Sequence, residues 1–104
     1  MISEDAAQAL AQCRVEIDAI DLELLALLNR RSRVVEEIGR IKESVELPVY
    51  EPKREDDVLR NVTQNNSGPL THDALQRIFE RIIDEMRSLQ KMRRQQRAQG
   101  ESEC

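Results

Sequence analysis

The chain has 104 residues, of which 35% are charged and 2% are aromatic, and its formal net charge is −4. This length suits one domain with a single core. The acidic balance argues against nucleic-acid binding through excess positive charge, and the low aromatic content, with Leu, Ile and Val as the large apolar groups, is typical of an all-α chain.

Targeting and redox signals are also informative. The first residues show no secretory signal pattern, and the apolar residues are periodic rather than contiguous, as in a chain without a membrane span. Cys13 and Cys104 have no metal-ligand spacing and form no disulfide framework, which fits a reducing compartment. We therefore expect a cytoplasmic protein without a metal site.

The first predicted element is a long amphipathic helix that begins after Ser3, a plausible N-cap, and runs to about Ser44, before Pro48. Its apolar seam has one charged member and consists of Leu10, Cys13, Ile17, Ile20, Leu24, Leu27, Arg31, Val34, Ile38, Ile41 and Val45. At 1.5 Å per residue the seam spans about 54 Å, which is too long to be covered within one small domain. We expect other helices, including those of a second copy, to cover it.

The second predicted element is a short helix from about Lys53 to Gln64. Pro52 suits its first turn, and the polar segment 65–69, rich in helix breakers, ends it. One face of this helix is expected to be buried and carries Glu55, Val58, Leu59 and Val62.

The third predicted helix starts after Thr71, a favourable N-cap. Its apolar stripe consists of Leu75, Phe79, Ile82, Met86 and Leu89. Ile78 and Ile83 widen this stripe. The apolar period is lost after Met92. We therefore predict an all-α domain of three helices (long, short, long) over residues 1–92, followed by a polar, disordered tail over residues 93–104.

Arg31 occupies a seam position where an apolar residue is expected. A charge there costs several kcal/mol unless it is paired and hydrogen-bonded. Taken alone, Arg31 could fix the register of packed helices or pair with a glutamate of its own chain. Lys42 lies about 20° from Arg31 around the helix axis and roughly 16.5 Å along it. The two cations share a face and could hold a small anion between them.

Other polar side chains fall on inward faces. Gln90 places a neutral amide on the third helix, and Glu55 places a carboxylate on the short helix, with Arg54 beside it. With the two cations they form a polar pocket lined by three helices, a common setting for ligand sites in bundles. Arg14 lies about 25 Å and 42 Å from those cations along a rigid helix. It is either a surface arginine or completes the pocket of a second, antiparallel chain.

In this order, the residues resemble the all-helical class of chorismate mutases over residues 8–92. The matching segments are Arg14–Asp21, Leu24–Arg31, Val35–Lys42, Val49–Glu55, Ile78–Phe79 and Leu89–Gln90. The resemblance implies an intertwined homodimer in which the long first helix spans both active sites. It also implies the Claisen rearrangement of chorismate to prephenate, a step toward phenylalanine and tyrosine that needs no metal or cofactor.

The resemblance also implies roles for individual residues. Arg31, Arg54 and the partner's Arg14 match the arginines that bind the substrate carboxylates, and a planar guanidinium suits that task because it can bind a carboxylate bidentately. These three residues would hold the substrate in its reactive shape, which removes conformational freedom before the barrier.

The remaining matches concern the reacting atoms and the hydroxyl. Lys42 and Gln90 would donate hydrogen bonds to the ether oxygen, which gains negative charge as the C–O bond breaks. Glu55 would accept the substrate hydroxyl. Glu51 stands where relatives often carry aspartate and is the further substrate-binding candidate.

Three alternatives remain open. An isochorismate-pyruvate lyase would share the fold and part of the site, although the segment Glu51–Glu55 favours the mutase. A regulatory domain would bind a larger enzyme of the shikimate pathway with little catalysis of its own, and a mutase could also be activated by such a partner. A purely structural helical dimer would give no reason for the inward-facing polar residues.

Overall fold

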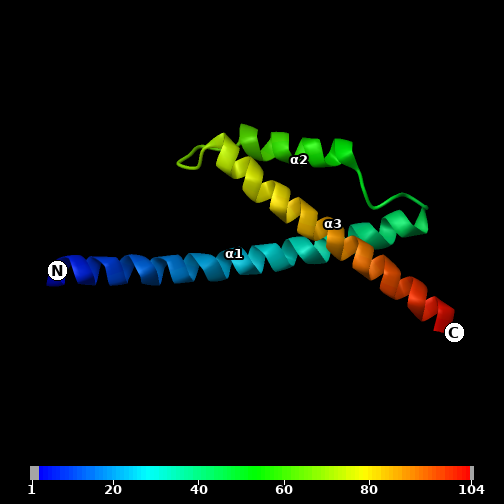
Figure 1. Cartoon of the computed structure of the whole chain (residues 1–104), viewed down its shortest axis with the longest axis horizontal. Coiled ribbons are helices and arrows are strands. Elements are labelled where there is room, and N and C mark those ends of the chain that lie inside the picture. The colour runs from blue at the N-terminus through cyan, green and yellow to red at the C-terminus, as the bar shows by residue number, and fades with distance from the viewer. Residues whose placement is uncertain (1–2, 104) are drawn as a thin grey trace. The chain divides into compact units, whose positions relative to one another are not determined.

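A computed structural model describes residues 3–103, with side chains for residues 3–100. It contains three helices, α1 (Glu4–Ser44), α2 (Pro52–Gln64) and α3 (His72–Glu103) (Figure 1). The described residues include no strand, which confirms the all-α class and the long, short, long order. The chain divides into two compact units, Met1–Arg33 and Val34–Cys104, and α1 contributes to both.

Side-chain caps start α1 and α3 at the predicted positions. Ser3 Oγ accepts a hydrogen bond from the N–H of Ala6 at 3.1 Å, and Thr71 Oγ1 accepts one from the N–H of Ala74 at 3.1 Å. Each cap satisfies one of the backbone donors that a helix leaves without a partner in its first turn. α2 begins at Pro52, one residue before the predicted start, because proline is preorganised for the first helical turn.

α1 ends in a Schellman turn. The N–H of Leu47 donates to the carbonyl of Lys42 at 2.7 Å, and the N–H of Glu46 donates to the carbonyl of Glu43 at 3.2 Å. Glu46 has a φ of 59°, in the left-handed region that this turn requires. The hydrogen bonds satisfy the last carbonyls of the helix and redirect the chain before it reaches Pro48.

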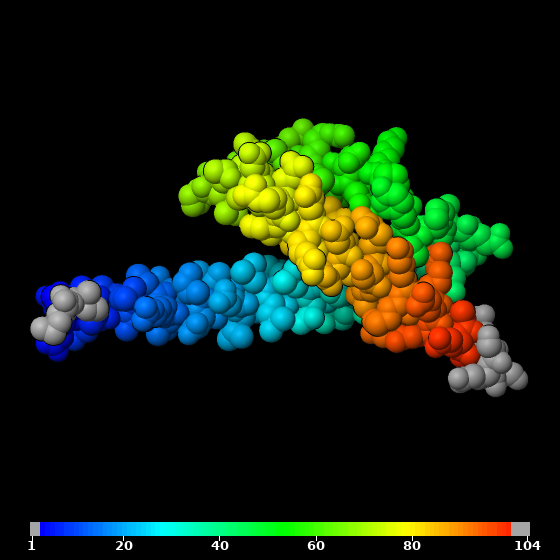
Figure 2. Space-filling model, viewed as in Figure 1, coloured from blue at the N-terminus to red at the C-terminus, as the bar shows by residue number. Residues whose placement is uncertain are grey.

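In the second unit, α2 and α3 contact one another and run antiparallel, lying closest near the end of α2 (Figures 1 and 2). The core of this unit is small and consists of apolar side chains from both helices and from α1. Buried members are Val35, Leu75, Ile83 and Met86, and half-buried members on α2 are Val58, Leu59 and Val62. Ile78 belongs to the predicted apolar stripe of α3 but, unlike the buried members of that stripe, it is exposed in the single chain.

α3 continues to Glu103, so the structure differs from the disordered tail predicted after residue 92. Two ion pairs tie this extension to α1: Arg93 Nε lies 2.9 Å from Glu36 Oε2, and Arg97 Nε lies 2.5 Å from Glu43 Oε2. These contacts come from charged residues, so a search for apolar periodicity misses them. The boundary of the functional domain at residue 92 stays a prediction, and Cys104 lies outside the described residues.

The apolar seam of α1 is exposed in the single chain. The exposed positions include Leu10, Cys13, Ile17, Ile20, Leu24, Leu27, Val34, Ile38, Ile41 and Val45. The buried residues of α1 form a neighbouring stripe instead: Val35, Gly39 and Lys42. Cys13 is exposed together with the seam to which it belongs. Every helix of the described chain falls short of the length or apolar character that crossing a membrane requires.

We expect Glu46→Gly to raise the free energy of unfolding by about 0.5–1 kcal/mol, because glycine adopts the left-handed conformation without the penalty that a Cβ imposes. Urea unfolding at a fixed protein concentration measures the change. The matched control is Glu46→Ala, which removes the same charge but keeps the Cβ and should give no gain. Equal stabilisation by both substitutions would contradict a backbone origin.

Candidate functional site

Lys42, in the last turn of α1, is the buried cation of the second unit. Its Nζ donates to the carbonyl oxygen of Val49 at 2.9 Å and lies 2.6 Å from Glu51 Oε1. Both partners come from the loop that follows the Schellman turn, which brings this loop back over the end of α1. An ammonium group has three donors, so these two contacts leave one for a ligand.

Gln90, on α3, faces the same part of α1. Its Cγ would lie 3.6 Å from a Cβ at Gly39, so the two helices approach closely here. Its Oε1 is buried and has no hydrogen-bond partner among the described residues. A buried polar atom without a partner costs about 1–3 kcal/mol, so this oxygen is suited to accept a hydrogen bond from a donor that the described residues do not supply.

Glu55, on α2, is held by an arginine of α3. Arg87 Nε donates to Glu55 Oε2 at 3.0 Å, and Arg87 Nη2 donates to Glu55 Oε1 at 2.5 Å. The guanidinium also lies 5.0 Å from the centre of the Tyr50 ring and 3.4 Å from Asp84. Its hydrogen bonds with Glu55 raise the pKa of Arg87 above the ordinary value.

Arg87 was not among the site residues predicted from the sequence. A signal was available: Arg87 follows Ile83 by four residues and precedes Gln90 by three, so it lies on the inward side of α3. Nothing in the sequence, however, indicates that its partner is a carboxylate 32 residues earlier in the chain.

The remaining predicted site residues are the three arginines Arg14, Arg31 and Arg54. Arg54 is exposed on α2 and makes no ion pair with a described residue. Arg14 and Arg31 belong to the first unit, where Arg14 is exposed and Arg31 is half-buried. Their part in the site stays a prediction.

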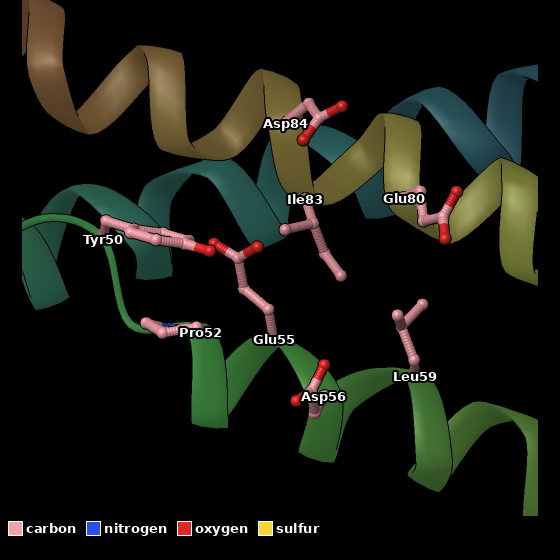
Figure 3. Close-up of a pocket in the computed structure, with 8 residues that line it drawn as sticks. All are labelled: Tyr50, Pro52, Glu55, Asp56, Leu59, Glu80, Ile83 and Asp84. Atoms are coloured by element: carbon pink, nitrogen blue, oxygen red, sulfur yellow. The ribbon is translucent and has the colours of Figure 1, made fainter.

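A hollow of about 170 Å³ lies between α2 and α3 (Figure 3). Its walls carry four carboxylates and four less polar side chains: Glu55, Asp56, Glu80, Asp84, Tyr50, Pro52, Leu59 and Ile83. In the close-up, Tyr50 and Glu55 point toward one another. The hollow is acidic, although Glu55 and Asp84 both lie next to the guanidinium of Arg87. The anionic groups of a ligand are favoured near the ammonium of Lys42 rather than against these carboxylates.

The helix order and the inward-facing cation, amide and carboxylate define a class of small all-helical domains with a polar interior. The sequence model of the family described as chorismate mutase type II matches residues 13–91, and the chain belongs to this family.

Relatives and solved structures agree with this assignment. The chain is 36% identical over 88 residues to a bifunctional chorismate mutase/prephenate dehydratase of Aquifex aeolicus, covering 81% of this chain and 24% of the relative. It is 28% identical over 87 residues to a chorismate mutase of Methanocaldococcus jannaschii, and this match covers 81% of this chain and 86% of the relative. The chain thus spans about a quarter of the length of the bifunctional relatives it matches.

Two solved structures have similar folds. A chorismate mutase of Thermus thermophilus superimposes with a TM-score of 0.79 at 35% identity, covering 80% of this chain and 94% of that one. A chorismate mutase of Helicobacter pylori in complex with prephenate superimposes with a TM-score of 0.76 at 33% identity, and the match covers 81% of this chain and 91% of that one.

We expect Glu51→Gln to lower the free energy of unfolding by about 1 kcal/mol, because it weakens the pairing of a buried ammonium group. Glu51 is itself 45% exposed, so water moderates the loss. The control is Glu85→Gln, which affects the exposed Arg81–Glu85 pair and should have a smaller effect. Equal effects in urea unfolding would show that burial of Lys42 does not strengthen its pairing.

Proposed function

We propose that this chain catalyses the rearrangement of chorismate to prephenate. The observation that carries the proposal is the buried Lys42, which retains one free donor, in a chain of the chorismate mutase type II family. In this reaction the C–O bond of the ether breaks while a C–C bond forms within the same molecule, so no nucleophile is needed. The protein has to hold the reactive conformation and stabilise the charge that develops on the ether oxygen.

Lys42 and Gln90 are proposed as the donors to the ether oxygen. A positive charge held in a largely buried setting acts strongly on a developing negative charge, and the Gln90 amide is a neutral donor without a proton to lose. Glu51 is proposed to act chiefly by holding Lys42, with which it pairs at 2.6 Å. Arg31 is proposed as a catalytic arginine that binds a substrate carboxylate, with Arg54 as a further substrate-binding arginine.

We also propose a homodimer with shared active sites. The support is the exposed apolar seam of α1, since exposed apolar surface of this extent marks an interaction site in soluble proteins. A second antiparallel copy crossing near residues 24–25 would cover the seam and would place the partner's Arg14 near Arg31 and Lys42.

Further proposals concern the cellular setting. A cytoplasmic location is supported by the family's biosynthetic role and by the free thiol of Cys13. An enzyme of the same pathway is a candidate partner, because the bifunctional relatives join a chorismate mutase to a prephenate dehydratase in one protein.

Purified protein should accelerate chorismate loss and prephenate formation, and Lys42→Ala or Gln90→Ala should each lower kcat by about 10²–10³, the effect of losing a donor to a developing oxyanion. The control is Lys91→Ala, an exposed neighbour of Gln90, which should keep its activity. Circular dichroism checks that each variant folds. No acceleration by the wild-type chain would overturn the proposed activity, and release of pyruvate from isochorismate would favour the lyase.

Mixing Arg14→Ala chains with Lys42→Ala chains should restore about a quarter of the wild-type activity, because half of the randomly formed dimers contain one intact site of two. Mixing Arg31→Ala with Lys42→Ala chains is the matched control. Those two residues are proposed to serve a site from the same chain, so no mixed dimer regains an intact site. Recovery in neither mixture would contradict donation of Arg14 by the partner.

A further inference from the structure

We propose that Arg87 is a positioning residue of the active site, which orients Glu55 toward the hydroxyl group of the substrate. This inference rests on the proposed mutase function and adds a residue that the family resemblance did not supply. It starts from the ion pair between Arg87 and Glu55, which spans 32 residues of sequence and joins α3 to α2.

The geometry of this pair restrains the carboxylate at two points. Nε and Nη2 of Arg87 each contact a different oxygen of Glu55, at 3.0 and 2.5 Å. A parallel two-point pair between guanidinium and carboxylate fixes direction as well as distance. Both side chains are about three-quarters buried, with 26% and 24% of their surface exposed. Glu55 therefore has little freedom to turn.

Arg87 is itself held from another direction. The face of the Tyr50 ring lies 5.0 Å from its guanidinium carbon, within the range of a cation–π contact. Tyr50 belongs to the loop that also carries the two partners of Lys42. Arg87 thus links α2, α3 and this loop, and the orientation of Glu55 depends on all three.

The pair still leaves Glu55 able to act on a ligand. An ionised carboxylate has about four acceptor positions, of which Arg87 occupies two, so a substrate hydroxyl can still donate to Glu55. Ion pairs within a single helix do not have this form. Arg81–Glu85 and Arg60–Asp57, for example, join residues three or four positions apart and are more exposed. Local pairs of that kind do not orient a group across an interface.

The test compares Arg87→Met with the wild-type chain on two substrates, chorismate and a chorismate analogue that lacks the ring hydroxyl. We expect kcat/KM for chorismate to fall roughly 10- to 100-fold, the scale of misplacing a substrate contact by about 1 Å. For the analogue, the two proteins should have the same kcat/KM, because Glu55 has no hydroxyl to accept. Arg81→Met, on the same helix, is the matched control and should change neither value.

Two further variants separate positioning from folding. Arg87→Lys keeps the charge but not the two-point pair, so it should recover part of the chorismate activity that Arg87→Met loses. It also serves as the folded variant if Arg87→Met does not fold. In a Glu55→Gln background, Arg87→Met should have little additional effect, since it acts through Glu55.

The outcomes are distinct. Equal losses on both substrates, or additive losses with Glu55→Gln, would overturn the positioning role and leave a structural one. An active wild-type chain with an unchanged Arg87→Met variant would overturn the positioning role alone. An inactive wild-type chain would overturn the proposed function, and the positioning role with it.

Discussion

The burial of the Lys42 ammonium is the constraint on which the second unit depends. A buried cation costs several kcal/mol unless it is paired and hydrogen-bonded, and its two partners here are the carbonyl of Val49 and the carboxylate of Glu51. Both can reach it because the chain turns back at Glu46. Glu51 directly precedes α2, so the same interaction connects the end of α1 to the start of the second helix.

α3 completes this arrangement by contacting both neighbours. Toward its middle, Arg87 holds Glu55 of α2, and farther along, Arg93 and Arg97 pair with glutamates of α1. Gln90 lies between these two sets of contacts, against α1 at Gly39. Partly exposed ion pairs add little to stability individually, but those of Arg87, Arg93 and Arg97 set the register of α3 against its neighbours.

The seam of α1 takes no part in the core of the single chain. Within this chain, few apolar residues are fully buried, and the large side chains of the seam remain in contact with solvent. In the proposed homodimer, covering this apolar surface would contribute much of the hydrophobic stabilisation of each chain. Folding and assembly of the two active sites would then be one process.

Much of the fold could be predicted because it depends on local chemistry. The caps at Ser3 and Thr71 and the start near Pro52 follow from single side chains, and the seam of α1 follows from its spacing. The boundary at residue 92 was predicted from the loss of apolar periodicity and stays a prediction. Periodicity gave no sign of the ion pairs by which Arg93 and Arg97 connect the end of α3 to α1.

Helical periodicity was enough to predict the three helices and to place Lys42, Gln90 and Glu55 on inward faces, because it shows which side chains share a face. The tertiary structure alone decided which partner each polar side chain has. Lys42 meets Glu51 through a turn formed by a non-glycine residue in the left-handed region, and Glu55 meets Arg87 across two helices. Neither pairing can be derived from periodicity, because each depends on the angle and register at which separate elements pack.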